Sequence, residues 1–195
     1  MATAATSICP LRSLTADDVA GSPRRTLLAT DAVRYISFMK SFEVVSNGVV
    51  YEARHLTEGA GGLADTVMLS ASLQLGDKLV VREGLNGPVV ASMDHNLAQT
   101  VFQCHGGSGE TLAELSFAWF TVKNGFALKM GEHEYKVEER KPSLFSCVSE
   151  TGATLMIIEA EKHFLGADRW RVSFAEQFPA PLALLSVVAL RQRRA

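Results

Sequence analysis

The sequence predicts a mainly β protein, a closed antiparallel barrel of about twelve strands around a C-terminal hydrophobic helix. Short β-prone runs recur from residue 42 onward at the spacing that is typical of barrels and sandwiches. Turn signals separate these runs, and the chain ends in an apolar segment that has no polar face. No alternation of strands with helices, which would indicate a parallel sheet, interrupts the pattern.

Three Asn-Gly dipeptides supply the strongest turn signals, because both residues tolerate the positive φ of a type I′ hairpin turn. They are Asn47-Gly48, Asn86-Gly87 and Asn124-Gly125. Together with the glycine-rich segment 106–109 they separate β-prone runs, which predict strands over 42–45, 49–53, 78–82, 88–93, 100–104 and 111–117. A weaker run covers 66–71, and later runs predict strands over 126–130, 134–138, 144–148, 153–159 and 169–174.

The C-terminal segment predicts a helix over residues 181–194. Its apolar run LALLSVVAL has nine residues, whereas a helix needs about 20 to cross a bilayer. Leu and Ala favour a helix, Pro181 suits its first turn, and the arginines at its end suit the helix dipole. A helix that is apolar on every face must be buried on every face, and among strands only the lumen of a closed barrel offers this. A strand, favoured by Val187 and Val188, and an interfacial membrane anchor remain as alternatives.

The composition excludes several classes of protein. The chain has 195 residues, with 19 Lys and Arg against 21 Asp and Glu, so its formal net charge is −2. This balance argues against a bulk nucleic-acid binder, because such binding depends on many cations that contact phosphates. With 47% apolar and 21% charged residues, the chain fits an ordinary soluble globular protein. We expect a flexible N-terminal arm over 1–35 and one barrel domain over 36–195.

The three cysteines are too few and too scattered for a disulfide framework or a four-ligand zinc site. Scattered cysteines are typical of a reducing compartment, so we expect a cytoplasmic protein, with a peripheral membrane or nuclear location as alternatives. We expect no transmembrane span, because the longest apolar run has only nine residues. Mitochondrial targeting is a minor alternative, because Asp17 and Asp18 do not suit an acid-poor targeting peptide.

A family resemblance rests on three segments of the chain. Residues 75–82, with the turn at Asn86-Gly87, resemble the strand, glycine turn and strand unit of the LURP-one-related proteins, and 100–115 look like a second copy. Residues 170–174 followed by 181–190 look like a last strand and a central helix. Over roughly residues 42–195 the chain thus resembles the tubby C-terminal superfamily, which includes the tubby-like proteins, the LURP-one-related proteins and the phospholipid scramblases.

The resemblance implies a twelve-stranded barrel around one helix. Tubby-like members bind phosphoinositide head groups through Lys and Arg on the barrel surface, and scramblases are linked to Ca²⁺-dependent lipid movement. The chain has no polybasic cluster that matches the tubby-like site, no cysteine-rich palmitoylation stretch and no acidic Ca²⁺ loop. The resemblance therefore carries over the fold and does not assign either activity to particular residues.

No motif predicts catalysis, a cofactor or a metal. The segment His105-Gly106-Gly107-Ser108-Gly109 lacks the G-x-S-x-G elbow of an esterase and the Walker pattern, so we interpret it as a hairpin loop. The five histidines lack metal-ligand spacing. Cys104 and Cys147 lie among apolar strand residues, where an inert buried thiol is expected.

The basic residues suggest one candidate binding site. On the predicted strand around residues 134–141, Lys136, Glu138 and Arg140 share one face, and Glu139 and Lys141 share the other, so charge there is compensated. A head-group site is more plausible where a set of cations converges, namely Lys78, Arg82, Lys123 and Lys129.

We therefore expect a non-enzymatic, tubby-like binding module for phosphoinositide or other anionic lipid head groups, or for a protein partner. The alternative is a lipocalin-like carrier, in which the apolar tail packs outside and an open lumen holds a small apolar ligand.

Overall fold

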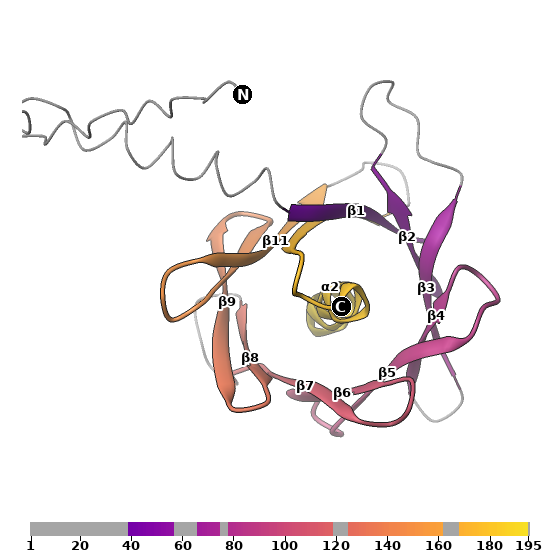
Figure 1. Ribbon diagram of the computed structural model, residues 1–195, viewed down its shortest axis with the longest axis horizontal. Coiled ribbons are helices and arrows are strands. Elements are labelled where there is room, and N and C mark those ends of the chain that lie inside the picture. The colour runs from indigo at the N-terminus through magenta and orange to yellow at the C-terminus, as the bar shows by residue number, and fades with distance from the viewer. Residues whose placement is uncertain (1–38, 57–65, 75–77, 119–124, 162–167, 195) are drawn as a thin grey trace, which may run out of the picture. The chain divides into compact units, whose positions relative to one another are not determined.

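The computed structural model describes residues 39–56, 66–74, 78–118, 125–161 and 168–194, which form twelve strands and one helix. The elements are β1 (Met39–Ser46), β2 (Val50–His55), β3 (Val67–Leu73), β4 (Leu79–Glu83), β5 (Val89–His95), β6 (Val101–Gly106), β7 (Thr111–Ser116), β8 (Gly125–Met130), β9 (His133–Lys141), β10 (Leu144–Val148), β11 (Thr154–Glu161), β12 (Asp168–Ala175) and α2 (Ala180–Arg194). Every strand is antiparallel to its neighbours in sequence, and β1 also pairs with β12, which closes the barrel (Figure 1). The predicted closed barrel of about twelve strands is confirmed, whereas the predicted arm over 1–35 lies outside the described residues.

Alternation along most strands separates the inside of the barrel from the outside, whereas β3, β4 and β5 each contain three consecutive buried residues. In β6, Phe102, Cys104 and Gly106 are buried, and the residues between them are partly exposed. The same alternation holds in β7 and β10, as the sequence pattern predicts for strands with one buried face. The inward residues pack into one continuous hydrophobic core with the helix.

The helix α2 lies in the lumen of the barrel (Figure 1). Every side chain from Leu182 to Leu190 is buried, with at most 6% of its surface exposed. The one polar side chain in this run, Ser186, donates a hydrogen bond of 2.9 Å to the carbonyl of Leu182 and so leaves no unpaired hydroxyl in the core. The predicted central helix is confirmed, and the open lumen that a lipocalin-like carrier requires is occupied by α2.

An up-and-down barrel has two rims, and α2 runs from one to the other. The connections after the odd-numbered strands lie at one rim, and those after the even-numbered strands lie at the other. The helix follows β12, so it starts at the second of these rims. It ends at the first, which we call the C-terminal rim, because Arg191 reaches Asp168 at the start of β12 and Tyr51 near the start of β2.

Arg191 fastens the end of the helix to the barrel wall. Its Nε donates to Asp168 Oδ2 and its Nη1 donates to the Tyr51 hydroxyl, both at 2.9 Å. The guanidinium also lies 5.5 Å from the centre of the Tyr51 ring, which in turn packs against Trp170. Arg191, in the last turn of the helix, thus holds it by specific contacts in addition to its favourable position near the negative end of the helix dipole.

The turns confirm the hairpins that Asn-Gly predicts, but their geometry differs from type I′. At the first turn only Gly48 has a positive φ, of 95°, and the Asn47 Oδ1 accepts hydrogen bonds from the N–H groups of Val49 and Val50. At the second turn the positive φ falls on Gly84, whereas Gly87 is required because a Cβ there would overlap the Glu83 carbonyl oxygen. The hairpin between β4 and β5 is longer than two residues, which moves the strained position. Asn124 lies outside the described residues.

Truncation of the central helix tests its role in the core. We expect Leu184→Ala to lower the free energy of unfolding by about 2–5 kcal/mol, because this side chain is fully buried and leaves a cavity. The matched control is Leu97→Ala at a fully exposed leucine, which should change stability by less than about 0.5 kcal/mol. Urea titration of both variants measures the difference, and equal stability of the two would contradict the central packing of α2.

Deletion of residues 179–195 provides a stronger test of the same model. Without α2 the inward side chains of the barrel lose their common packing partner, so the truncated chain should lose its cooperative thermal transition and aggregate. A cooperative melt near that of the parent protein would show that the barrel is stable without its helix.

Candidate functional site

Two of the four predicted head-group residues meet in one hollow on the outer face of the barrel. Lys78 and Arg82 line a cavity of about 320 Å³ over β4, β5 and β6. Lys129 lies on β8, separated from β4 by three strands, and Lys123 lies outside the described residues. The structure therefore reduces the predicted cluster to a pair of cations in a defined cavity.

The floor of this hollow is formed by outward-facing side chains of paired strands. Val80 on β4 is opposite Ser92 on β5, and only 5% and 6% of their surfaces are exposed. Lys78, Val80 and Arg82 alternate along the chain and so point to the same face. The remaining lining residues come from the flanks of the hollow, and they are Gln74, Val89, Gly106, Gly107 and Gly109. None of the described residues that line this cavity is acidic.

Arg82 is held in position by its own hairpin. Its Nη1 donates a hydrogen bond of 3.2 Å to the carbonyl of Gly87 in the turn between β4 and β5. The opposite wall comes close because residue 107 is a glycine, where a Cβ would lie 2.7 Å from the Val89 carbonyl oxygen. The glycine loop therefore packs against β5 and gives the hollow its second side.

The glycine loop itself is a hairpin connection, as the sequence predicts. The N–H groups of Gly106 and Gly109 bond to the carbonyls of Glu110 and Gly106, at 2.8 and 3.0 Å. The Glu110 carboxylate accepts a hydrogen bond of 2.6 Å from the Ser108 hydroxyl. This bond, together with the backbone N–H groups of Glu110 and Ser108, lowers the pKa of Glu110. Since the loop already holds a carboxylate of its own, the cations of the hollow are the better candidates for binding an external anion.

Lys129 occupies a different electrostatic environment from the hollow. It is exposed on β8, and its register partners on the neighbouring strands are Glu114 on β7 and Glu134 on β9. Carboxylates on both sides offset its charge. This placement makes Lys129 a suitable control for the cations of the hollow.

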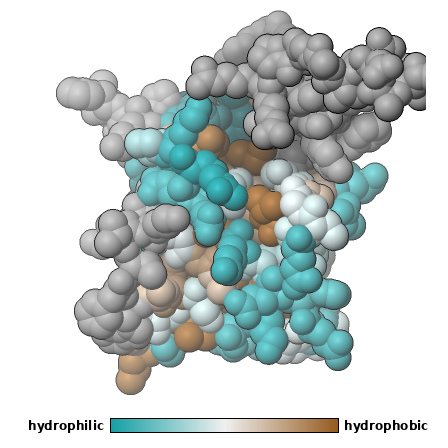
Figure 2. All heavy atoms as spheres, turned by 90° about the vertical axis from the view of Figure 1, so that its left-hand side faces the viewer, coloured by the Kyte–Doolittle hydropathy of each residue, from teal (hydrophilic) through white to brown (hydrophobic). Residues whose placement is uncertain are grey.

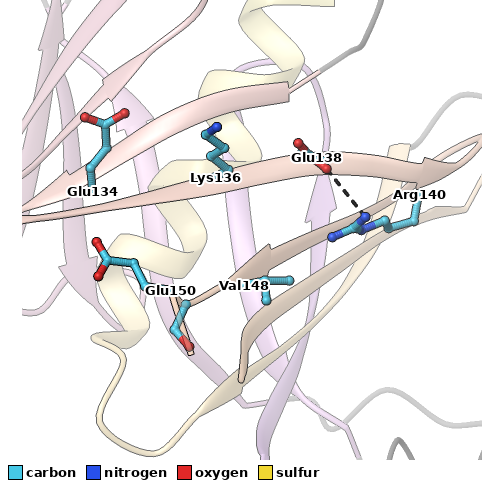
Figure 3. Close-up of a pocket in the computed structure, with 7 residues that line it drawn as sticks. Glu134, Lys136, Glu138, Arg140, Val148 and Glu150 are labelled. Carbon is cyan, nitrogen blue, oxygen red and sulfur yellow. Dashed lines mark ion pairs between the residues drawn. The ribbon is translucent and has the colours of Figure 1, made fainter. Parts of the chain in front are cut away.

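A second hollow, of about 380 Å³, lies over β9 and β10 (Figure 3). Glu138 and Arg140 form an ion pair of 3.5 Å, and the Arg140 Nε donates to the Ser146 hydroxyl at 3.0 Å. Lys136 lies between this pair and the carboxylates of Glu134 and Glu150 (Figure 3). The prediction that Lys136, Glu138 and Arg140 share one face of a strand is confirmed, and cations and anions are mixed within this hollow.

The outer face around this second hollow is polar. The side of the barrel with β9 and β11 in Figure 1 faces the viewer in Figure 2, and hydrophilic side chains cover much of its described surface. The ion pair between Arg171 on β12 and Glu161 on β11, at 3.5 Å, belongs to the same kind of cross-strand charge compensation.

Both described cysteines are enclosed in the core. Burial raises the pKa of Cys147 to about 12, and burial together with the nearby Asp94 does the same for Cys104. These groups stay protonated at neutral pH, which opposes nucleophilic chemistry. Within the described part of the chain, no group of three or more His, Cys, Asp or Glu residues could hold a metal ion.

Sequence reasoning identified Lys78 and Arg82 but missed Val80 and Ser92. The sequence does contain one signal for Val80, because this apolar residue occupies an outward position between the two cations Lys78 and Arg82. A valine there breaks the alternation expected for a solvated face and indicates a covered patch. The role of Ser92 depends on the pairing of β4 with β5 and on the glycine loop that follows β6.

Comparisons with known proteins bring no further assignment. No known family model, no curated protein and no solved structure matches the chain. The resemblance to the tubby C-terminal superfamily therefore stays a prediction. Among the described residues no helix has both the length and the apolar character needed to cross a bilayer.

The thiols give a test that depends on pH. In a Cys9→Ser background, the native protein at pH 8 should react with a thiol reagent about three orders of magnitude more slowly than the unfolded protein. The reason is that a pKa of about 12 leaves few thiolates in the fold. The unfolded chain loses these protons from about pH 8.5, so stability should fall as the pH rises from there towards 12. Rapid labelling of native Cys104 and Cys147 would contradict this assignment.

Proposed function

We propose that the chain is a non-enzymatic, tubby-like binding module that holds an anionic lipid head group in the hollow beside Lys78 and Arg82. The observation that carries this proposal is the pairing of two cations in one cavity whose described lining contains no carboxylate. An anion entering this cavity would meet positive charge on one strand without a competing negative group in the lining.

The two cations suit a phosphate-bearing ligand in different ways. A guanidinium presents five N–H donors in a planar fork that matches phosphate oxygens, and a lysine supplies a mobile point charge. The bond from Arg82 to Gly87 fixes one side of the guanidinium before any ligand arrives. Such preorganisation lowers the entropic cost of binding.

Other arginines on the described outer face already have anionic partners, which supports the hollow as the preferred place for an added anion. Arg54 contacts Glu52 at 2.5 Å, and Arg169 lies 3.6 Å from Glu43. Arg171 and Arg140 are likewise paired with Glu161 and Glu138. An anion that bound beside any of these arginines would have to compete with a carboxylate of the protein.

The charge balance of the whole chain limits the range of this attraction. With a formal net charge of −2, the protein lacks a long-range positive field. The hollow would act over about a Debye length, roughly 8 Å at physiological ionic strength, so binding should weaken as salt is added.

Flotation with vesicles tests the proposal directly. The parent protein should float with phosphatidylcholine vesicles that contain phosphoinositide and should not float with phosphatidylcholine alone. Each of Lys78→Gln and Arg82→Gln should weaken binding about fivefold, since a cation near an anionic surface contributes about 1 kcal/mol.

Lys129→Gln removes the same charge outside the hollow and serves as the matched control. It should leave vesicle binding within about twofold of the parent, because Glu114 and Glu134 already offset its charge. Equal losses in all three variants would show that binding depends on total charge, and absence of binding by the parent would refute the proposed function.

A further inference from the structure

The two rims of the barrel carry different charges. At the rim opposite the C-terminal rim, each connection after β6, β8 and β10 contains a glutamate, and another follows β12; these are Glu110, Glu132, Glu150 and Glu176. At the C-terminal rim, the described parts of the connections after the odd-numbered strands contain no acidic residue. The ends of the elements at this rim carry both signs: the cations are Lys78 before β4, Lys141 at the end of β9 and Arg191 and Arg193 in the last turn of α2, and the acids are Asp94 near the end of β5, Glu161 at the end of β11 and Asp168 at the start of β12.

Apolar side chains are exposed along one arc of the C-terminal rim. The arc consists of the three successive hairpins β1–β2, β3–β4 and β5–β6, which are neighbours around the barrel. Among the described residues, which leave out 75–77 of the β3–β4 hairpin, each hairpin has one large exposed apolar side chain: Val49 is 68% exposed, Leu73 is 49% exposed and Leu97 is fully exposed. Exposed apolar residues that occur singly are common on protein surfaces, but several on neighbouring hairpins of one rim are typical of an interaction surface.

In the β1–β2 and β5–β6 hairpins, an asparagine side chain forms hydrogen bonds with the backbone of the loop that presents the apolar residue. The Asn96 Oδ1 accepts hydrogen bonds from the N–H groups of Thr100 and Val101, at 2.8 and 3.2 Å, which closes the loop that presents Leu97. Asn47 plays the same part in the turn that presents Val49, with bonds of 3.1 and 2.9 Å. Neither apolar side chain can easily retract into the core, because a side-chain hydrogen-bond network fixes the backbone beneath it.

We propose that this arc of the C-terminal rim docks on an anionic bilayer, with Val49 and Leu97 entering the interface and Lys78 contacting the head groups. Apolar insertion combined with nearby cations is the combination that anchors peripheral proteins to anionic membranes. The opposite rim also has exposed apolar residues, Leu85 among them, but its glutamates would be repelled by the same surface. The glutamates in the described connections of the opposite rim thus favour the C-terminal rim as the side that faces the bilayer.

This orientation rests on the proposed function and makes it more specific, because Lys78 belongs both to the arc and to the hollow. From Lys78 the hollow extends along β4 to Arg82, over four residues of extended chain or roughly 13 Å. A lipid head group rising from the docked membrane would enter the hollow at the Lys78 end. The ligand source is therefore a lipid in a bilayer, and a soluble phosphate compound would use only the hollow.

The test measures vesicle binding and soluble head-group binding separately. The double variant Val49→Asn with Leu97→Asn keeps the charge and should weaken flotation with phosphatidylcholine vesicles containing phosphatidylserine and phosphoinositide by about tenfold or more. It should still bind a soluble inositol phosphate with the affinity of the parent. The matched control is Leu85→Asn, which removes an exposed leucine (53% exposed) from the opposite rim and should leave flotation unchanged.

Each outcome separates the docking arc from the hollow. If the double variant floats like the parent whereas Lys78→Gln with Arg82→Gln does not, the arc is wrong and the proposed function stands. If soluble inositol phosphate fails to bind the parent but flotation still depends on Val49 and Leu97, the arc stands and the head-group hollow is wrong. A loss with Leu85→Asn as large as that of the double variant overturns the orientation. Leu97→Asn alone, at a fully exposed position, repeats the test if the double variant misfolds.

Discussion

The helix at the centre of the barrel has no polar face, and the rest of the structure depends on how this helix is covered. A helix with its side chains is about 10 Å across, so the wall around it must be wide as well as closed. Eight strands would enclose only enough space for their own side chains, whereas a barrel of twelve strands leaves room for the helix. Burial of the run Leu182–Leu190 on all sides then joins every strand to one core.

Filling the lumen places any binding site on the outside or on the rims. The interior that holds a ligand in lipocalins is occupied here by leucine and valine side chains of α2. Specificity must then come from a pattern on the outer face, where charges are mostly compensated across neighbouring strands, as in the pairs Arg169–Glu43 and Arg171–Glu161. The hollow at Lys78 and Arg82 departs from this pattern, because both charged residues of its described lining are cations.

The two proposals share one physical basis, which is local charge on a nearly neutral protein. A formal net charge of −2 conceals an uneven distribution among the described residues, with glutamates in the connections at one rim and no acidic residue in the connections at the other. Such a distribution orients a protein at an anionic surface without a strong overall attraction. The hydrogen bonds of Asn47 and Asn96 add rigidity to the loops that would meet that surface.

The sequence by itself determined the number and order of the strands, the hairpins and the buried helix, because these depend on local turn chemistry and on hydrophobic patterns. Residues such as Gly48 and Leu184 carry that information within a few positions of the chain. The sequence by itself could not decide which cations lie close together in the folded barrel. Lys78 and Arg82 lie four residues apart, but their hollow needs Ser92 and Gly107 from other strands, and Lys129, equally basic, is placed between glutamates by strand register. Only the closed sheet decides such neighbours, since register and loop packing arise from the whole barrel.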